Sequence, residues 1–284
     1  MNAWRTARRV VAGLGALAFL ATATACGEEP KFLGRTRVNV AYKNDQPGTS
    51  YWDKGKYSGF DSYVGAHVTQ QLKVTHSPKL VTSDLRETEI TGGLADLVIA
   101  TYSITPQRAE EVAFVGPYAV TDQGYMVMAG SGRPVIESES DLKDKNICTM
   151  TSTTAVENLR RQGLNNVKEV SSASTCVDLL LGGKTDAFFM DEMILYGFQA
   201  AKPEKGLRIF KGKAGEPQFY GIGMPKRHLS DCENLKKIVK AYVQSGQWTT
   251  DFTAALPEFT KGHPTEVEEH RPSPGLLDKL SCRG

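Results

Sequence analysis

The sequence lacks the short motifs that mark the commonest enzyme classes. It contains no GxSxG, HExxH or GxGxxG pattern and no complete Walker A motif. No two cysteines stand at CxxC spacing, and the 5 histidines are scattered without the spacing of metal ligands. Motifs therefore give no support for a catalytic serine, a zinc site or a nucleotide-binding loop, and we predict no metal and no cofactor.

A strong excess of one charge is also missing. The chain has 34 Lys plus Arg against 32 Asp plus Glu, and Arg5, Arg8 and Arg9 stand close to its start. Without residues 1–25, 31 basic residues remain against 32 acidic ones, which is a net charge near −1. The charge balance therefore gives no support for a nucleic-acid partner.

The apolar run from Val10 to Ala23 is too short to remain across a bilayer. It follows the three arginines and precedes small residues, a pattern typical of a secretory signal. Ala23-Thr24-Ala25-Cys26 resembles a bacterial lipobox. We therefore expect residues 1–25 to be a lipoprotein signal peptide, Cys26 to carry lipid and residues 26–35 to be a linker. An ordinary export signal with an incidental Cys26 is the alternative.

Cysteine is scarce, with 5 residues in the chain. If Cys26 carries lipid, the remaining four are an even number in an oxidising compartment, where disulfides form. Three connectivities exist for four cysteines. We favour Cys148 with Cys176 and Cys232 with Cys282, because each pair then stays within one region of the chain.

Short apolar runs alternate with helical patterns, which is typical of an α/β fold with a largely parallel sheet. The strands expected from the sequence are 37–42, 79–82, 96–100, 146–150, 167–170 and 187–190. The helices expected from it are 63–72, 87–94, 154–162, 176–181, 234–245 and 248–256. The pattern restarts after Gly130-Ser131-Gly132, so two α/β lobes are predicted, with the last helices able to return to the first lobe.

One segment of the chain is recognisable as a whole. It runs from Ala100-Thr101-Tyr102-Ser103-Ile104-Thr105-Pro106-Gln107-Arg108 through Val112-Ala113-Phe114 to Gly116-Pro117-Tyr118. It resembles the hallmark segment of the polar amino-acid-binding proteins of ABC importers, the bacterial extracellular solute-binding proteins of family 3. The likeness extends over Lys184-Thr185-Asp186-Ala187 and Tyr220-Gly221-Ile222-Gly223 and covers about residues 36 to 256.

Further short segments look most like the actinobacterial glutamate-binding lipoproteins. They are Asp45-Gln46-Pro47-Gly48, the placement of Cys148 and Cys176, and Ile194-Leu195-Tyr196-Gly197. The resemblance implies a two-lobe periplasmic-binding-protein-like fold of type II with two crossover segments, near Ala129 and Gly221. It places lobe 1 at 36–129 and 222–262, lobe 2 at 130–221 and a C-terminal tail at 263–284.

An α-amino acid carries a carboxylate and an ammonium on one carbon, so its site needs a fixed cation beside a fixed anion. Arg108 stands at the family position for the carboxylate, which a planar guanidinium binds through two parallel hydrogen bonds. Asp191 stands at the position that receives the ammonium. The resemblance further implies that Ser103 donates to the carboxylate and that Thr101 lines the site.

The second lobe is expected to contribute a helix start. Thr153 and Thr154 open the predicted helix, and Thr154-Ala155-Val156-Glu157 has the form of a capping box. Free amides at a helix start favour an anion, so both threonines are candidate ligand contacts. Relatives usually carry Gly where this chain has Ser152.

Side-chain specificity depends on positions outside the hallmark segment. Arg86 resembles the arginine that binders of dicarboxylic amino acids direct toward the distal carboxylate; a solvated cation at a helix start is the alternative. Asn44 stands where relatives often place an aromatic platform. That departure favours aspartate, glutamine or asparagine as alternatives to glutamate, and Tyr51, Trp52 and Phe60 are the aromatic residues nearby.

These inferences predict a non-enzymatic, extracytoplasmic binding protein, anchored at the outer face of the cytoplasmic membrane through Cys26. It would bind a free amino acid, most simply glutamate, as a monomer and deliver it to an ABC permease. A sensor lipoprotein that signals to a membrane receptor or kinase would use the same pocket. An enzyme on this fold is a third reading, for which Glu192, expected to be solvated, is the acid nearest to Asp191.

Overall fold

The structure is a computed structural model that describes residues 34–130, 132–211, 217–261 and 266–283. The expected signal peptide, the expected lipidation site Cys26 and most of the expected linker lie outside these residues. Among the residues that the structure describes, no helix combines the length and the apolar character needed to cross a bilayer.

The strands alternate with helices along most of the chain. The strands are β1 (Arg37–Tyr42), β2 (Asp45–Gln46), β3 (Ser50–Asp53), β4 (Lys56–Ser58), β5 (Thr75–Leu80), β6 (Leu97–Val98), β7 (Ala113–Thr121), β8 (Gln123–Met128), β9 (Ile147–Met150), β10 (Val167–Val170), β11 (Ala187–Asp191), β12 (Leu207–Lys211) and β13 (Gln218–Met224). The α-helices are α1 (Phe60–Gln71), α2 (Arg86–Thr91), α3 (Pro106–Glu111), α4 (Thr154–Arg161), α5 (Ala173–Leu181), α6 (Glu192–Ala201), α7 (Leu229–Val243), α8 (Gly246–Ala255), α9 (Glu266–Glu269) and α10 (Pro274–Leu280). The short 3₁₀ turns are η1 (Glu139–Leu142), η2 (Pro203–Lys205), η3 (Lys226–His228) and η4 (Pro257–Thr260).

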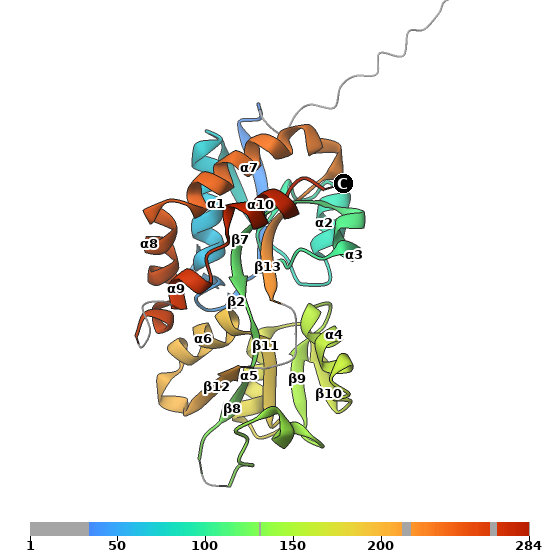
Figure 1. The fold of residues 1–284 in the computed structure, drawn as a ribbon, viewed down its shortest axis with the longest axis vertical. Helices are drawn as coiled ribbons and strands as arrows, with labels where there is room; N and C mark the ends of the chain where they lie inside the picture. Colours follow the sequence, from blue (N-terminus) through green and yellow to red (C-terminus); the bar gives the residue numbers. More distant parts are fainter. Residues whose placement is uncertain (1–33, 131, 212–216, 262–265, 284) are drawn as a thin grey trace, which may run out of the picture.

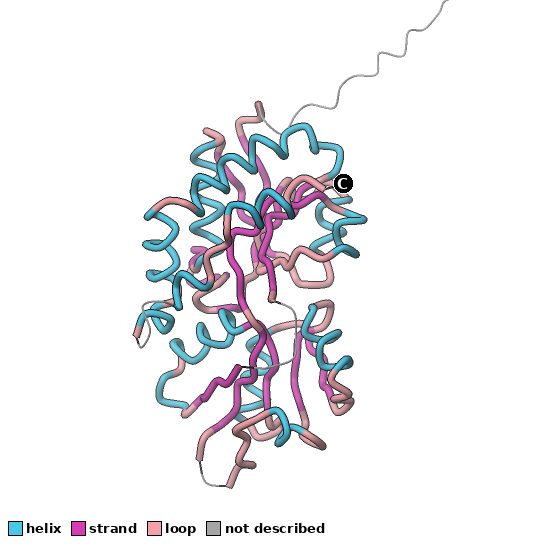
Figure 2. Tube along the Cα trace, viewed as in Figure 1, coloured by secondary structure: helices cyan, strands magenta, loops and turns pink. Residues whose placement is uncertain are grey.

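Two five-stranded sheets form two lobes, which lie one above the other in Figure 1. The first sheet has the order β5-β1-β6-β13-β7 and the second has the order β10-β9-β11-β8-β12. Within each sheet one strand, β13 or β8, runs against its two neighbours, and the other pairs are parallel. Helices cover both sheets (Figure 2). The two-lobe α/β fold predicted from the sequence is confirmed.

The chain changes lobe earlier than the sequence predicted. β7 pairs in the first sheet and β8 pairs in the second, so the first crossing lies at Asp122 rather than near Ala129. The return falls between β12 and β13, because β13 from Gln218 onward already pairs with β7. The two strands on either side of Asp122 follow each other almost without a break, and this continuity left no loop signal in the sequence.

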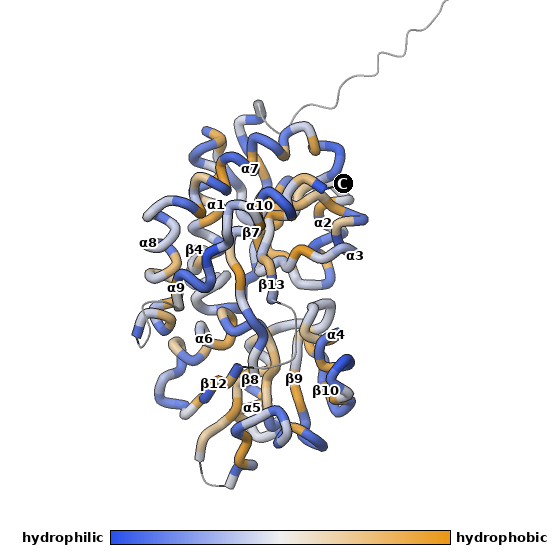
Figure 3. The backbone as a smooth tube through the Cα atoms, viewed as in Figure 1, coloured by the Kyte–Doolittle hydropathy of each residue, from blue (hydrophilic) through white to orange (hydrophobic). Residues whose placement is uncertain are grey.

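Each lobe has its own apolar core. Branched and aromatic side chains of the strands pack under α1, α7 and α8 in the first lobe and under α4, α5 and α6 in the second. Figure 3 shows apolar residues concentrated on the strands inside each lobe and polar residues on the outer helices. Met193 of α6 is an exception, because it packs into the core of the first lobe. The lobes are therefore in apolar contact as well as covalently joined.

The C-terminal segment belongs to the first lobe. α10 packs on β7 and α7, and the Cys282 amide donates to the Phe114 carbonyl at 2.8 Å. The hydroxyl of Ser281 donates to the Gly116 carbonyl at 2.9 Å. Residues 266–283, part of the segment expected to be a C-terminal tail, are thus packed against the first lobe.

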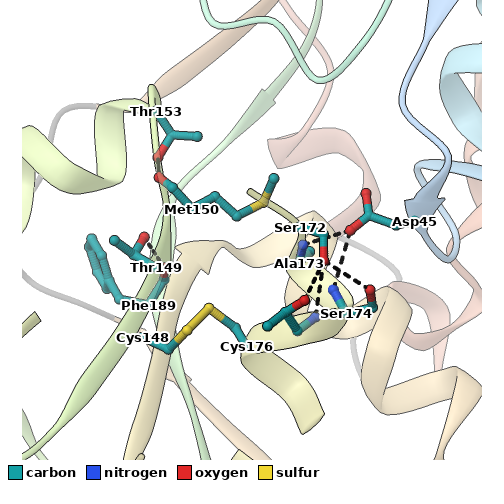
Figure 4. Close-up of a disulfide and its surroundings, with 11 residues drawn as sticks. Asp45, Cys148, Thr149, Met150, Thr153, Ser172, Ala173, Ser174, Cys176 and Phe189 are labelled. Carbon is teal, nitrogen blue, oxygen red and sulfur yellow. Dashed lines mark hydrogen bonds between the residues drawn. A yellow bond between two sulfur atoms is a disulfide. The ribbon is translucent and has the colours of Figure 1, made fainter. Parts of the chain in front are cut away.

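Both disulfides lie within a single lobe. Cys148 pairs with Cys176 and Cys232 pairs with Cys282, the two pairs favoured from the sequence. The first joins β9 to α5 within the second lobe (Figure 4). The second joins α7 to the end of the C-terminal segment. Neither bridge crosses between the lobes, so neither restricts a movement of one lobe relative to the other.

Candidate functional site

A cavity lies between the lobes, and all seven residues that the sequence singled out as ligand contacts line it. Its volume is about 10 Å³, room for about one water molecule. The lining residues come from both lobes: Gln46, Ser83, Arg86, Thr101, Ser103, Arg108, Met150, Thr153, Thr154, Met190 and Asp191. The sequence did not identify Gln46, Ser83, Met150 or Met190 as members of this set.

Arg108 enters the cavity from α3. The helix starts at Pro106, and the Thr105 hydroxyl caps it by accepting from the Arg108 amide at 3.2 Å. The guanidinium donates through Nη1 to the Ser103 carbonyl at 2.8 Å, and its Nε lies 3.4 Å from Glu87 Oε1. Burial, and to a smaller extent the neighbouring Arg86, lower the pKa of Arg108 to about 10. The side chain is thus a cation from which much of the water has been removed.

Arg86 is the first residue of α2 and is almost fully buried, which excludes the solvated alternative. Its Nε donates to the Ser83 carbonyl at 3.2 Å. Its Nη1 lies 3.3 Å from the Ala100 carbonyl and 3.4 Å from the Thr101 carbonyl. Backbone oxygens therefore hold this guanidinium, and among the described residues no carboxylate lies within ion-pair distance of it.

Both arginines lie close to the ring of Tyr102. Its ring centroid lies 4.5 Å from the Arg86 guanidinium carbon and 5.1 Å from that of Arg108. The Tyr102 hydroxyl donates to Glu87 Oε1 at 2.7 Å. Contact with the ring is favourable for each cation, although the two like charges repel each other.

The carbonyl of Ser152 is where the second lobe meets these arginines. It accepts from Arg86 Nη2 at 3.1 Å and from Arg108 Nη2 at 3.1 Å. Ser152 has a φ of 56°, a left-handed conformation that glycine adopts without strain. This explains why a Gly is usual at the position. The serine bears a strain on the order of 1–3 kcal/mol, and two charged donors offset it.

Thr101 has a second left-handed backbone, with φ 45°. Its amide donates to Asp61 Oδ2 at 2.9 Å, and its hydroxyl donates to Gln46 Oε1 at 3.1 Å. Asp61 is buried in α1, and its other oxygen accepts from the Tyr118 hydroxyl at 2.6 Å. Burial raises the pKa of Asp61 to about 7 in spite of these donors. The carboxyl thus holds a β-branched residue in a strained position at the cavity wall.

Asp191 ends β11 and is buried. It accepts from the Tyr220 hydroxyl at 2.6 Å and from Gln123 Nε2 at 2.8 Å. Burial raises the pKa of Asp191, while these two hydrogen bonds and the charges of Arg108 and Arg86 lower it. The acid is therefore oriented by neutral donors, one from β13 in the first lobe and one from β8 in the second.

Gln123 links Asp191 to the start of α4. Its Nε2 also donates to Thr154 Oγ1 at 3.1 Å, and its Oε1 accepts from the Asn158 amide. Thr154 Oγ1 in turn donates to Gln218 Oε1 at 2.7 Å. The sequence analysis assigned no role to Gln123, Gln218 or Tyr220, although Tyr220 stands in a segment that resembles the family. These residues face Asp191 and Thr154 from segments far away in the chain, and only the fold brings them together.

The predicted capping box at Thr154 is wrong. The helix starts at Thr154, as the sequence predicted, but its N-cap residue is Thr153, and the Thr153 hydroxyl makes no capping hydrogen bond. Thr153 Oγ1 donates to the Met150 carbonyl at 2.7 Å, and Thr154 Oγ1 is taken by Gln123 and Gln218. Both threonines nevertheless line the cavity.

Two further expectations are also changed. Glu192, expected to be solvated, is 1% exposed at the start of α6 and is absent from the cavity lining.

The segment that includes Asn44 contributes a different residue to the site. Asn44 is absent from the cavity lining, and Gln46 lines the cavity instead. The Nε2 atom of Gln46 lies 3.7 Å from the Met150 sulfur of the other lobe. Tyr51 and Trp52 are partly exposed and Phe60 is in the core, so none of them forms a platform here.

The site thus places two buried cations in one lobe and a buried carboxylate in the other, with hydroxyls and amides between them. Such an arrangement suits a small molecule with an anionic and a cationic pole. No group of three or more His, Cys, Asp or Glu that would hold a metal ion occurs in the described part of the chain.

Comparisons with known proteins agree with this geometry. Residues 38–261 match the family described as bacterial extracellular solute-binding proteins, family 3. The glutamate-binding protein GluB of Corynebacterium glutamicum is 35% identical over 91% of this chain and 94% of its own. A glutamine-binding protein of Geobacillus stearothermophilus is 29% identical over 73% of this chain and 79% of its own. Among solved structures, the arginine-, lysine-, histidine-binding protein ArtJ of Geobacillus stearothermophilus superposes with a TM-score of 0.72 at 22% identity, covering 82% of this chain and 99% of that one.

Proposed function

The chain belongs to the bacterial extracellular solute-binding proteins of family 3, and we propose that it binds one free polar amino acid, glutamate, between its lobes. The observation that carries this proposal is that Arg108 and Asp191, contributed by different lobes, line one small cavity. A guanidinium on one side and a carboxylate on the other match the two poles of a zwitterion. The 35% identity to a glutamate-binding protein supports the choice of glutamate.

Each side chain at the site has a role in this proposal. Arg108 would turn from the carbonyls of Ser103 and Ser152 to the α-carboxylate, which the Ser103 hydroxyl and the first amides of α4 also reach. Asp191 would accept the ammonium while Tyr220 and Gln123 keep it in place. Thr101, Thr153 and Thr154 would line the cavity, and Arg86 would face the distal end of the ligand.

The cavity that Arg108 and Asp191 line together is many times smaller than an amino acid, so a ligand that contacts both residues would need the lobes to separate. Two crossings without an interlobe disulfide allow such a hinge movement. Contacts that need both lobes then exist only in the closed form, so the ligand shifts the equilibrium toward closure. A membrane permease with its ATPase would recognise that form and receive the amino acid.

The proposal includes the attachment of the chain to the membrane. Residues 1–25 would be cleaved and Cys26 acylated, which holds the monomeric protein at the outer face of the cytoplasmic membrane. Changing Cys26 to Ala would then move the protein from the membrane fraction to the medium. Retention of the Cys26→Ala protein in the membrane fraction would contradict the lipid anchor without affecting the binding proposal.

The test of binding is calorimetry of the purified protein against the twenty standard amino acids. Glutamate should bind, and the heat should disappear in Arg108→Ala and in Asp191→Ala. If no amino acid of the twenty binds, the proposal is wrong. If glutamine binds and glutamate does not, the amino-acid site stands and the choice of ligand is wrong.

A further inference from the structure

Lys43 is a buried cation behind the cavity to which the sequence assigned no role. It follows β1 directly and is 1% exposed. Its Nζ donates to Ser83 Oγ at 3.2 Å, and Ser83 is a lining residue of the cavity. Among the described residues this is the ammonium's one hydrogen bond, although the group carries three hydrogens.

Ser83 brings Lys43 and Arg86 to the same end of the cavity. The lysine contacts the Ser83 hydroxyl, and Arg86 Nε donates to the Ser83 carbonyl at 3.2 Å. Within the part of the chain that the structure describes, neither cation has a carboxylate within 4.0 Å. Two buried positive charges without a paired anion are costly to the folded state. A bound anion at this end would relieve that cost.

Three charged groups act on the pKa of Lys43 in addition to burial. Burial lowers the pKa of Lys43 to about 8; Asp45 and Asp84 raise it, and Arg86 lowers it. The lysine is therefore still largely charged at neutral pH. It loses its proton about two and a half pH units lower than an exposed lysine would.

The hydrogen bonds at this end distinguish a carboxylate from a carboxamide. Ser83 Oγ accepts from Lys43, so its own hydrogen is free to donate into the cavity. The carbonyls of Ser83, Ala100 and Thr101 already accept from Arg86. A carboxylate finds donors here, whereas the NH₂ group of an amide meets a positive potential opposed to it and carbonyls that each already accept from Arg86.

We propose that Lys43 determines specificity: with Arg86, and acting through Ser83, it selects a ligand with a second carboxylate over the corresponding amide. This inference rests on the proposed amino-acid site and deepens it, since it names the dicarboxylic class as the ligand. Lys43 is a positioning residue, because Ser83 stands between its ammonium and the cavity.

The test compares glutamate with glutamine in the full-length wild-type protein and in Lys43→Met, by calorimetry at pH 7. The variant should lose at least tenfold in glutamate affinity, because the positive charge behind Ser83 and the hydrogen bond that orients the Ser83 hydroxyl are both removed, and less than threefold in glutamine affinity. Ser83→Ala should lower the same ratio while the lysine remains. Lys205→Met, at an exposed lysine of η2, is the matched control and should change neither affinity.

The pH profile gives a readout that a merely structural role would not move. The glutamate-to-glutamine affinity ratio of the wild type should fall about tenfold between pH 7 and pH 9, as Lys43 loses its proton. The α-ammonium titrates in both ligands and cancels in the ratio. In Lys43→Met the ratio should be flat over that range.

The outcomes separate the two proposals. An equal loss of affinity for glutamate and glutamine in Lys43→Met would overturn the specificity role. A glutamate-to-glutamine affinity ratio that changes with neither the substitution nor the pH would overturn it too. A wild-type protein that prefers glutamine would overturn it as well and leave the amino-acid site intact. A wild-type protein that binds no amino acid would overturn the proposed function and this inference together.

Discussion

Gly197 of α6 in the second lobe lies directly against the backbone of Pro47 in the first. A Cβ atom on Gly197 would lie 1.8 Å from the Pro47 carbonyl oxygen, a distance that no packed side chain tolerates. Gly48 faces the same contact, with φ 78° and its own Cβ position 3.3 Å from the Gly197 Cα. The two segments that look most like the glutamate-binding lipoproteins thus meet each other across the lobe boundary.

Replacing Gly197 by Ala should hold the lobes apart without touching the ligand. The methyl group has backbone on its far side, so the lobes must separate by more than an ångström to admit it. We expect at least tenfold weaker amino-acid binding and a larger radius of gyration in X-ray scattering with ligand present. Gly246→Ala is the matched control, because nothing lies within 4 Å of a Cβ there. Unchanged affinity in Gly197→Ala would show that the contact does not limit closure.

Arg108→Lys should separate charge from geometry at the carboxylate position. Lysine keeps the positive charge but replaces a planar fork by a single ammonium, so the second parallel hydrogen bond is lost. We expect affinity to fall about tenfold in Arg108→Lys and further in Arg108→Ala, as measured by calorimetry. Arg160→Lys, on the exposed face of α4, is the control. Equal affinities in the wild type and Arg108→Lys would contradict bidentate binding.

Binding should weaken in acid because of Asp191. Burial raises the pKa of Asp191, and only the ionised form attracts an ammonium, so affinity falls as pH drops through that pKa. The loss should reach at most about tenfold per pH unit. Glutamine is the better probe, since its side chain does not titrate. Asp191→Asn should bind weakly at all pH values. A wild-type affinity that does not change between pH 4 and pH 8 would refute this role.

Asp61 should make the protein less stable as pH rises toward neutrality. Its pKa is raised from 3.8 to about 7 by burial, so between these values the folded chain binds a proton that the unfolded chain has released. The free energy of unfolding therefore decreases with rising pH, by a contribution on the order of 4 kcal/mol at most. Urea titrations of the wild type and Asp61→Asn from pH 4 to pH 8 should differ by this slope. Parallel curves would exclude it.

The sequence predicted the parts of the fold that have a clear period. The strands β1 and β10 have the predicted bounds, and β9 and β11 differ from them by one residue. α6 was missed because it follows β11 without a loop, so no turn residues separate the strand from the helix in the sequence. The hairpin strands β2, β3 and β4 were missed because they are short.

The site shows a similar division. Arg108 and Asp191 stand in recognisable segments, and they line the same cavity. Lys43, Gln123 and Tyr220 matter only through partners that are distant in sequence, at separations of 40, 68 and 29 residues respectively. These hydrogen bonds depend on the register of the sheets, so they cannot be predicted from the sequence before the fold is known.

Asp45 adds a polar contact to the lobe boundary. Its Oδ2 accepts from the Ala173 amide at 2.6 Å and from the Ser174 amide at 3.3 Å, at the first turn of α5 (Figure 4). The Cys148–Cys176 bridge ties that turn to β9. A carboxylate is favourable at a helix start, so this contact stabilises the closed arrangement whatever occupies the cavity.

Both described ends of the chain are fastened to the same lobe. Arg35 pairs with Asp96 at 2.6 Å, and Cys282 is bonded to Cys232. A tether, a bead or a fluorescent dye attached at either described end therefore reports on the position of the first lobe, and the second lobe moves relative to it. A distance measurement of lobe opening needs its second probe on α5 or the outer strand β10, because the distance between two probes on the first lobe would not change when the lobes separate.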